Sequence, residues 1–242
     1  MTVTSLRTGV VLPSFRDTPD EAMAVAEQAE AAGLDGVFCY DHLWPMGQPG
    51  RPALAPFPLL AAIARRTSSV SVGTLVARVG LVPDDVLVAE FDALALLAPG
   101  RVVAGLGTGD RLSASENVAY GVPFAPAAER LTALGNCARA LRARGLPVWI
   151  GGGRRTVAVA EAVGAAVNLW AAPLEVVAAQ SARCEVTWGG PPPTGDAGGG
   201  AAGALDALVR SLAAAGATWV VFGWPVALDE LAAAAEAVRL GR

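Results

Sequence analysis

The sequence of 242 residues contains no lysine, so all 18 of its basic side chains are arginines. Without lysine there is no Schiff-base amine, which excludes lysine aldolases and pyridoxal phosphate enzymes. The same absence excludes the P-loop lysine of nucleotide hydrolases. The 18 basic and 22 acidic residues give a net charge of −4. This balance argues against a nucleic-acid-binding surface and against binding to anionic membranes.

Metal-binding side chains are also scarce. His42 is the only histidine, and Cys39, Cys137 and Cys184 lie far apart in the sequence. The usual spacings of a zinc site cannot be assembled from them, and a two-histidine iron site is excluded, so we expect no metal. An odd number of cysteines without a signal-peptide pattern predicts reduced thiols and a cytoplasmic protein. The longest uncharged run, 211–228, contains two glycines and a proline, which indicates a helix end and a strand instead of a membrane span.

Short apolar runs alternate along the chain with longer, alanine-rich helical stretches. The runs are apolar nearly throughout, as expected of parallel strands that are buried on both faces. Their midpoints are about 30 residues apart, which is the length of one βα unit. The eight predicted strands are 9–12, 36–39, 70–76, 101–106, 148–150, 167–170, 184–188 and 219–222.

Eight strand–helix units predict an α/β fold, a closed (β/α)8 TIM barrel formed by one domain of residues 1–242. An open doubly wound sheet is the alternative. The Gly- and Pro-rich stretch 189–203 predicts a mobile loop after the seventh strand. In such a barrel the active site lies at the carboxyl ends of the strands, so the residues that follow each strand are the candidates.

Asp41 and His42 close the second strand. An imidazole at this position can accept or donate a proton near pH 7. Successive strand residues point to opposite faces, so Asp41 contacts either the imidazole or the neighbouring loop. A capping pair without a catalytic role is the alternative for both residues.

Two glycine-rich segments follow the fourth and fifth strands. The first, 105–110, lets a flat ligand approach the backbone closely and brings Asp110 to the barrel mouth, unless Asp110 belongs to a solvated turn. The second, 151–153, joins a strand to a helix and is followed by Arg154 and Arg155. Bare amides at a helix N-terminus beside arginine predict a phosphate site, with a flexible turn as the alternative.

Tryptophans gather where the later strands end. Trp170, Trp188 and Trp224 end the sixth, seventh and eighth strands, and Trp44 closely follows His42. An aromatic rim suits a planar ring ligand, although bulky side chains also serve simply to cap a barrel.

Seven segments, taken in their order and spacing, resemble the bacterial luciferase-like monooxygenase family and its deazaflavin-dependent branch, which uses coenzyme F420. They are 9–13, 31–38, 41–42, 64–67 with 72–74, 99–109, 120–124 and 148–153. The resemblance implies a barrel with coenzyme F420, or alternatively FMN, across its mouth and the phosphate near the glycines of 151–153. It also implies a non-proline cis peptide at Leu75–Val76.

The resemblance further implies roles for individual residues. His42 and Asp110 match catalytic positions, although Asp110 replaces a glutamate and is one methylene shorter. Trp44 is expected to contact the substrate, although it lies two positions before the family's tryptophan, and Trp170 and Trp224 of the aromatic rim are expected to do the same. The expected cofactor-binding residues are Asp41, Thr74, Leu75, Val76, Gly107, Thr108, Gly151, Gly152, Gly153 and Arg154.

These expectations lead to an oxidoreductase that transfers a hydride between coenzyme F420 and a small organic substrate. An FMN-dependent monooxygenase and a catalytically weak flavin-binding partner subunit are the alternatives. The chain is short for the family and lacks most of the insertion near the seventh strand. We therefore expect a pocket that is open, or that a second copy completes in a homodimer. An open pocket favours hydride transfer, because oxygen chemistry on a reduced flavin needs protection from water.

Overall fold

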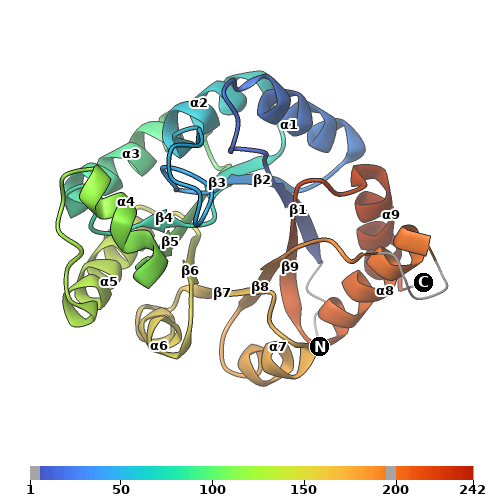
Figure 1. Ribbon diagram of the computed structural model, residues 1–242. Coiled ribbons are helices and arrows are strands. Elements are labelled where there is room, and N and C mark those ends of the chain that lie inside the picture. The colour runs from blue at the N-terminus through green and yellow to red at the C-terminus, as the bar shows by residue number, and fades with distance from the viewer. Residues whose placement is uncertain (1–5, 195–199, 242) are drawn as a thin grey trace.

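The strands form one closed parallel sheet, which Figure 1 shows as a ring surrounded by helices. The computed structural model describes residues 6–194 and 200–241. The sheet order is β3-β2-β1-β9-β8-β7-β6-β5-β4, and pairing of β3 with β5 closes it. The predicted TIM barrel is thus confirmed, and the open sheet is excluded. The strands are β1 (Arg7–Val11), β2 (Gly36–Cys39), β3 (Ser71–Thr74), β4 (Ala77–Arg78), β5 (Val102–Gly107), β6 (Val148–Gly151), β7 (Ala166–Trp170), β8 (Val186–Gly190) and β9 (Ala217–Gly223).

A helix follows each strand of the barrel when β3 and β4 are counted as one interrupted strand. One short helical segment was not predicted from the sequence. That segment is the 3-10 turn η1 (Arg111–Ser113) with α4 (Ala114–Ala119), between β5 and α5. The predicted 189–203 loop is too long: Gly189 and Gly190 belong to β8, and 200–203 begin helix α8, while 195–199 lie outside the described residues. No helix in the described ranges is long and apolar enough to cross a membrane. The outer helices are α1 (Asp20–Ala32), α2 (Pro56–Arg66), α3 (Asp84–Leu97), α5 (Ala127–Ala143), α6 (Arg154–Val163), α7 (Leu174–Ser181), α8 (Gly200–Ala214) and α9 (Leu228–Arg239).

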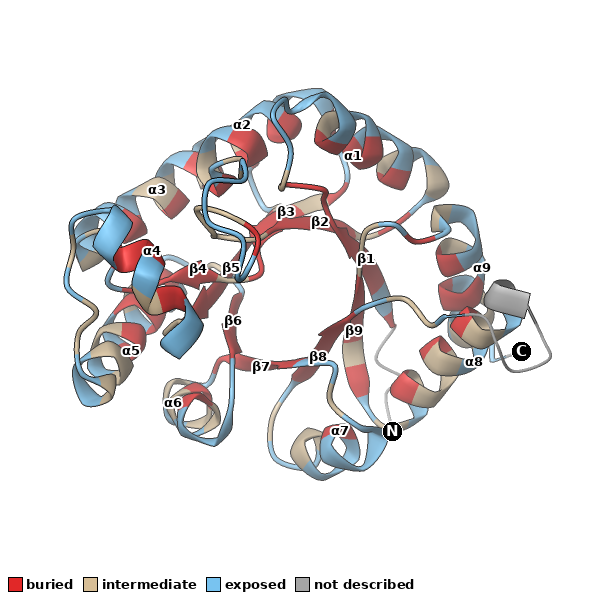
Figure 2. Ribbon diagram, viewed as in Figure 1, coloured by how far each residue is buried: buried red, intermediate tan, exposed pale blue. Residues whose placement is uncertain are grey.

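The helices bury the side that faces the sheet, as the colouring of Figure 2 shows. Helix α1 is representative: Asp20 and Glu21 lie in its first turn, where they complement the helix dipole, and Gly33 ends it with a φ of 85°. Its buried residues, Ala22, Val25, Ala26 and Ala29, recur at helical spacing. The resulting outer core joins helices and strands around the whole ring.

A second apolar core fills the inside of the barrel. Phe38 and Trp149 stack there with ring centroids 5.0 Å apart, and Trp219 meets Trp149 edge-on at 5.2 Å. Gly36 makes room for these rings, because a Cβ there would lie 3.0 Å from the Trp219 ring. The aromatic cluster therefore forms a floor within the barrel.

The third strand of the barrel is interrupted, although the sequence predicts one continuous strand over 70–76. Strand β3 ends at Thr74, and β4 resumes at Ala77 beside Leu106 of β5. The Leu75–Val76 peptide between them is cis, as the family resemblance implies. This break brings Arg78 to the carboxyl end of the barrel, opposite Gly107.

Candidate active site

A cavity of about 500 Å³ opens at the carboxyl ends of the strands. Ten of the predicted site residues line it: His42, Leu75, Val76, Gly107, Thr108, Asp110, Gly151, Gly152, Gly153 and Trp170. The other predicted site residues, Asp41, Trp44, Thr74, Arg154 and Trp224, are not among its lining residues. Thr74 is fully buried and donates its hydroxyl hydrogen bond to the carbonyl of Gly105 at 2.7 Å.

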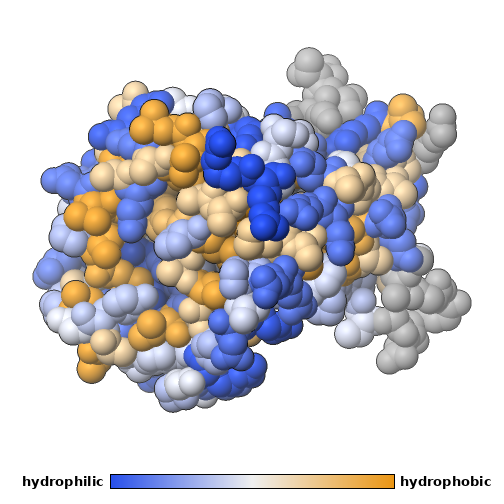
Figure 3. Space-filling view, turned by 90° about the horizontal axis from the view of Figure 1, so that it is seen from above, coloured by the Kyte–Doolittle hydropathy of each residue, from blue (hydrophilic) through white to orange (hydrophobic). Residues whose placement is uncertain are grey.

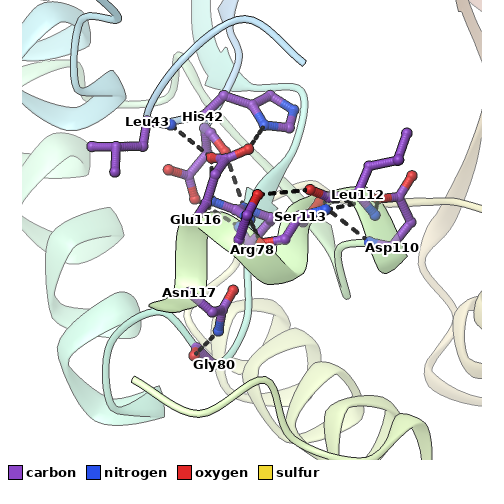
Figure 4. A network of polar contacts seen from close by, with 11 residues as sticks. His42, Leu43, Arg78, Gly80, Asp110, Leu112, Ser113, Glu116 and Asn117 are labelled. Carbon is purple, nitrogen blue, oxygen red and sulfur yellow. Dashed lines mark hydrogen bonds and ion pairs between the residues drawn. The ribbon is translucent and has the colours of Figure 1, made fainter. Parts of the chain in front are cut away.

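The imidazole of His42 is held by a glutamate that sequence reasoning missed. Nδ1 of His42 lies 2.9 Å from Oε1 of Glu116, which comes from α4 (Figure 4). The other carboxylate oxygen, Oε2, accepts the backbone N–H of Leu43 at 2.7 Å. Because an ionised carboxylate only accepts hydrogen bonds, this contact favours a proton on Nδ1 and leaves Nε2 as the basic nitrogen.

Glu116 is itself fixed by Arg78, and the two form a buried ion pair. Only 1% of Glu116 and 4% of Arg78 is exposed, and Nη2 of Arg78 lies 2.9 Å from Oε2 of Glu116. Arg78 also donates from Nε to the carbonyl of Asp41 at 3.1 Å and from Nη1 to that of Ser113 at 3.4 Å. One network thus connects the ends of β2 and β4 with α4 (Figure 4).

Asp41 holds the neighbouring strand and not the imidazole. Its Oδ2 accepts the backbone N–H of Arg78 at 2.8 Å, which resolves the alternative left open by the sequence. Burial raises the pKa of the Asp41 carboxyl, while the hydrogen bond from Arg78 and its charge act in the opposite direction. Asp41 therefore supports the site from below the lining.

Asp110 lies at the cavity edge and caps the segment that carries Glu116. Its Oδ1 accepts the backbone N–H groups of Leu112 at 2.8 Å and of Ser113 at 3.1 Å. The Ser113 hydroxyl in turn accepts the N–H of Asp110, which completes a reciprocal capping box. The bonds that the carboxylate accepts use Oδ1, so Asp110 combines a structural task with a position on the lining.

The cavity wall is shaped by glycines that pack against Val76. A Cβ at Gly107 would lie 2.5 Å from Cγ2 of Val76, and a Cβ at Gly151 would lie 3.0 Å from Cγ1. Glycine at these positions lets Val76 pack closely against the ends of β5 and β6. The wall there is smooth backbone with one branched side chain, which suits a flat ring.

Aromatic side chains form another part of the cavity lining. The rings of Phe15 and Tyr40 stack at 5.7 Å, and Trp170 meets Tyr40 edge-on at 5.9 Å. Burial raises the pKa of Tyr40 to about 12, so its phenol stays neutral at physiological pH. Of the rim tryptophans expected from sequence, Trp188 is buried against Phe222 and Trp224 donates to Glu21, both outside this cavity.

The amino terminus of α6 borders the cavity and an adjoining groove of about 550 Å³. Gly152, Gly153 and Trp170 line both, whereas Arg154 lines only the groove. Helix α6 begins after Gly153 without a side-chain cap, and a Cβ at Gly153 would meet nothing within 4 Å. Open backbone amides beside an arginine are suited to an anion.

A larger cavity, about 680 Å³, opens at the amino-terminal ends of the strands, on the other side of the aromatic floor. Its basic side chains are engaged: Arg101 donates to three carbonyls, and Arg183 pairs with Glu161 at 2.8 Å. Barrel chemistry is located at the carboxyl ends of strands. The smaller cavity with His42 is therefore the candidate active site.

Fold and site together define a TIM-barrel protein with an anchored histidine at the carboxyl-terminal mouth. The chain belongs to the luciferase-like monooxygenase family, whose model matches residues 2–144. Over 126 residues it is 36% identical to an F420-dependent glucose-6-phosphate dehydrogenase of Beutenbergia cavernae. The aligned segment covers 52% of this chain and 37% of that protein. Over 106 residues it is 40% identical to an F420-dependent hydroxymycolic acid dehydrogenase of Mycobacterium tuberculosis, covering 43% of this chain and 29% of that protein.

The chain thus spans about a third of the length of these curated relatives. Among solved structures, an F420-dependent secondary alcohol dehydrogenase superimposes with a TM-score of 0.79 at 14% identity, over 97% of this chain and 99% of that one. The F420-dependent tetrahydromethanopterin reductase of Methanopyrus kandleri gives a TM-score of 0.72, also at 14% identity, over 97% of each chain. These two similarities establish the barrel fold.

Proposed function

We propose that the chain is an oxidoreductase that transfers a hydride between coenzyme F420 and a small organic substrate. The observation that carries this proposal is the His42 imidazole, held by buried Glu116 and facing a cavity with a smooth backbone wall. The F420-dependent dehydrogenases among its relatives support the same choice of cofactor. The FMN-dependent monooxygenase is the second candidate, because the matching family is described as luciferase-like monooxygenases.

The residues present fit a deazaflavin. Val76 packs closely over Gly107 and Gly151, and the three residues together line the cavity with backbone and one branched side chain, a surface against which a planar ring can lie. Leu75 and Thr108 extend this wall. The amides at the start of α6 and the Arg154 guanidinium would hold the cofactor phosphate.

When bound, the deazaflavin supplies a carbon that accepts or releases a hydride. His42 accepts or donates the accompanying proton. With Nδ1 committed to Glu116, Nε2 accepts the hydroxyl proton of an alcohol that is being oxidised, or returns it to a carbonyl that is being reduced. Asp110 is the proposed second proton carrier, because it lies on the cavity lining and the hydrogen bonds to its carboxylate use Oδ1 and not Oδ2.

A titration of the purified protein with F420 and with FMN, followed by tryptophan fluorescence, tests the cofactor. Trp170 lies on the cavity lining, so a bound ring should quench its fluorescence. We expect F420 to do so at lower concentrations than FMN. Bleaching of the visible absorbance of F420 in the presence of an alcohol then tests hydride transfer. Preferential FMN binding with oxygen consumption would support the monooxygenase instead, and binding of neither would refute both.

We also propose that the protein is a homodimer. Val86, Leu96 and Leu97 on α3 are exposed, and Figure 3 shows apolar side chains gathered toward the side on which α3 lies in Figure 1. Light scattering of wild type and of Leu96→Glu tests this, with Leu240→Glu as the control for an exposed leucine elsewhere. A monomeric wild type would refute it. The cytoplasmic location stays a prediction, supported by three free thiols.

A further inference from the structure

The described residues that line the cavity offer a substrate no uncommitted arginine. Arg78 is the one arginine on its described lining, and its three bonds to Asp41, Ser113 and Glu116 hold it 96% buried beneath the surface. Arg130, which contacts the lining loop from behind, donates to the carbonyls of Thr108 and Gly109 and stacks over Phe124. Neither guanidinium is placed to receive an anion in the cavity.

The charge that does face the cavity has the opposite sign. Asp110 contributes a carboxylate to the lining, and the Arg78 charge is balanced by that of Glu116. A phosphate group that entered the cavity would approach this exposed carboxylate and would find no ionic partner on the described lining. Moving an unpaired charge out of water is strongly unfavourable. Arg154 does not alter this balance, because it lies in the adjoining groove beyond Gly153, at the proposed phosphate position of the cofactor.

The wall beside His42 is instead suited to hydrocarbon. The His42 ring centroid lies 6.4 Å from those of both Phe15 and Tyr40, so a group bonded to His42 would rest against these rings. At the mouth, 57% of Met46 and 47% of Trp170 is exposed, although both line the cavity. Large apolar side chains left exposed at a concave site mark a surface that an apolar ligand covers.

We propose that this site takes a neutral, unphosphorylated alcohol, or the corresponding carbonyl compound, whose apolar body packs against Phe15, Tyr40, Met46 and Trp170. This inference rests on the proposed function. In the oxidation, the carbinol C–H bond breaks and its electron pair leaves as hydride to the oxidised deazaflavin. The O–H bond breaks as its proton passes to Nε2 of His42, and the C=O bond forms. The substrate class thus differs from the sugar phosphate in the name of the Beutenbergia cavernae relative.

The test compares binding of cyclohexanol with binding of glucose 6-phosphate, by ligand-observed saturation-transfer NMR, with and without F420. We expect cyclohexanol to bind and glucose 6-phosphate to bind at least about tenfold more weakly. Equal or tighter binding of the sugar phosphate, or no binding of cyclohexanol, would overturn the inference. Absence of F420 binding would contradict the proposed function alone, since the two ligands can be compared on the cofactor-free protein.

A charge placed at the mouth sharpens this test. Met46→Lys should weaken cyclohexanol binding by about fivefold or more and strengthen glucose 6-phosphate binding, because it replaces apolar surface with a cation. Leu240→Lys makes a matched change at an exposed leucine outside the cavity and should shift neither affinity. If Met46→Lys leaves both affinities unchanged, the substrate does not lie against this wall and the inference fails.

Discussion

Glu116 contacts the imidazole of His42, which lies 74 residues earlier in the sequence, with Oε1 2.9 Å from Nδ1. Replacing this carboxylate by an amide can place a hydrogen-bond donor where the acceptor was. In Glu116→Gln, an N–H group facing Nδ1 would force the proton onto Nε2, which then cannot accept a proton from an alcohol. We expect turnover to fall by about 10²-fold while F420 affinity changes little, as measured by steady-state rates and fluorescence titration.

The same substitution leaves the Arg78 guanidinium buried without its carboxylate. Breaking a buried pair by removing one partner costs about 3–5 kcal/mol, so urea denaturation should show a loss of this size. Asp92→Asn breaks the exposed pair with Arg144 and serves as the control, with an expected loss under about 1 kcal/mol. A Glu116→Gln protein of unchanged turnover and stability would show that the network is incidental.

His42 itself is the most direct test of the proton step. His42→Ala should lower turnover by about 10²-fold or more, with little change in cofactor affinity. His42→Asn keeps a hydrogen-bonding group that cannot titrate near pH 7, so this variant should bind F420 and not turn over. Stopped-flow measurement of hydride transfer checks both. Retention of most activity by His42→Asn would make His42 a positioning residue, and Asp110, Tyr40 or water would then carry the proton.

Arg154 tests the position of the cofactor phosphate. Arg154→Ala should weaken F420 binding by about 1–3 kcal/mol through loss of a charge-assisted hydrogen bond. Arg155→Ala removes the same charge from the same helix turn at a residue that lines neither the cavity nor the groove, and should have a much smaller effect. Equal dissociation constants for wild type and Arg154→Ala would move the phosphate elsewhere.

Glu30 makes part of the barrel's stability dependent on pH. Its carboxylate is partly desolvated, yet hydrogen bonds from Ser69, Ser68 and Val70 outweigh this and lower its pKa to about 2. Because the folded pKa lies below the unfolded value, the stabilisation is complete above about pH 4.5 and is lost as the pH falls toward 2. Glu30→Gln should therefore cost about 1–2 kcal/mol at pH 7 and much less at pH 2.5, by urea denaturation. An equal cost at both pH values would contradict this.

The barrel could be predicted because each strand is a short run buried on both faces, a pattern that parallel sheets require. The interruption after Thr74 could not be predicted from hydropathy, since Leu75 and Val76 continue the apolar run. It followed only from the family resemblance. Helix α4 escaped prediction because six residues are too few for a periodic pattern.

Glu116 was not predicted as a site residue because helix α4, which carries it, was not predicted. Glu116 lies among polar and small residues that resemble a solvated turn, and its burial depends on Arg78, which is distant in sequence. A local signal existed: Asp110 and Ser113 have the spacing of a capping box, which marks the start of a helical segment. Arg78, a charged residue directly after an apolar strand, was visible at the barrel mouth, but nothing local indicated its partner.

The aromatic floor of Phe38, Trp149 and Trp219 has a kinetic consequence. Since these rings close the barrel beneath the cavity, cofactor and substrate would both approach it from the carboxyl ends of the strands. Saturating the protein with one of the two should therefore slow the exchange of the other, which stopped-flow mixing measures.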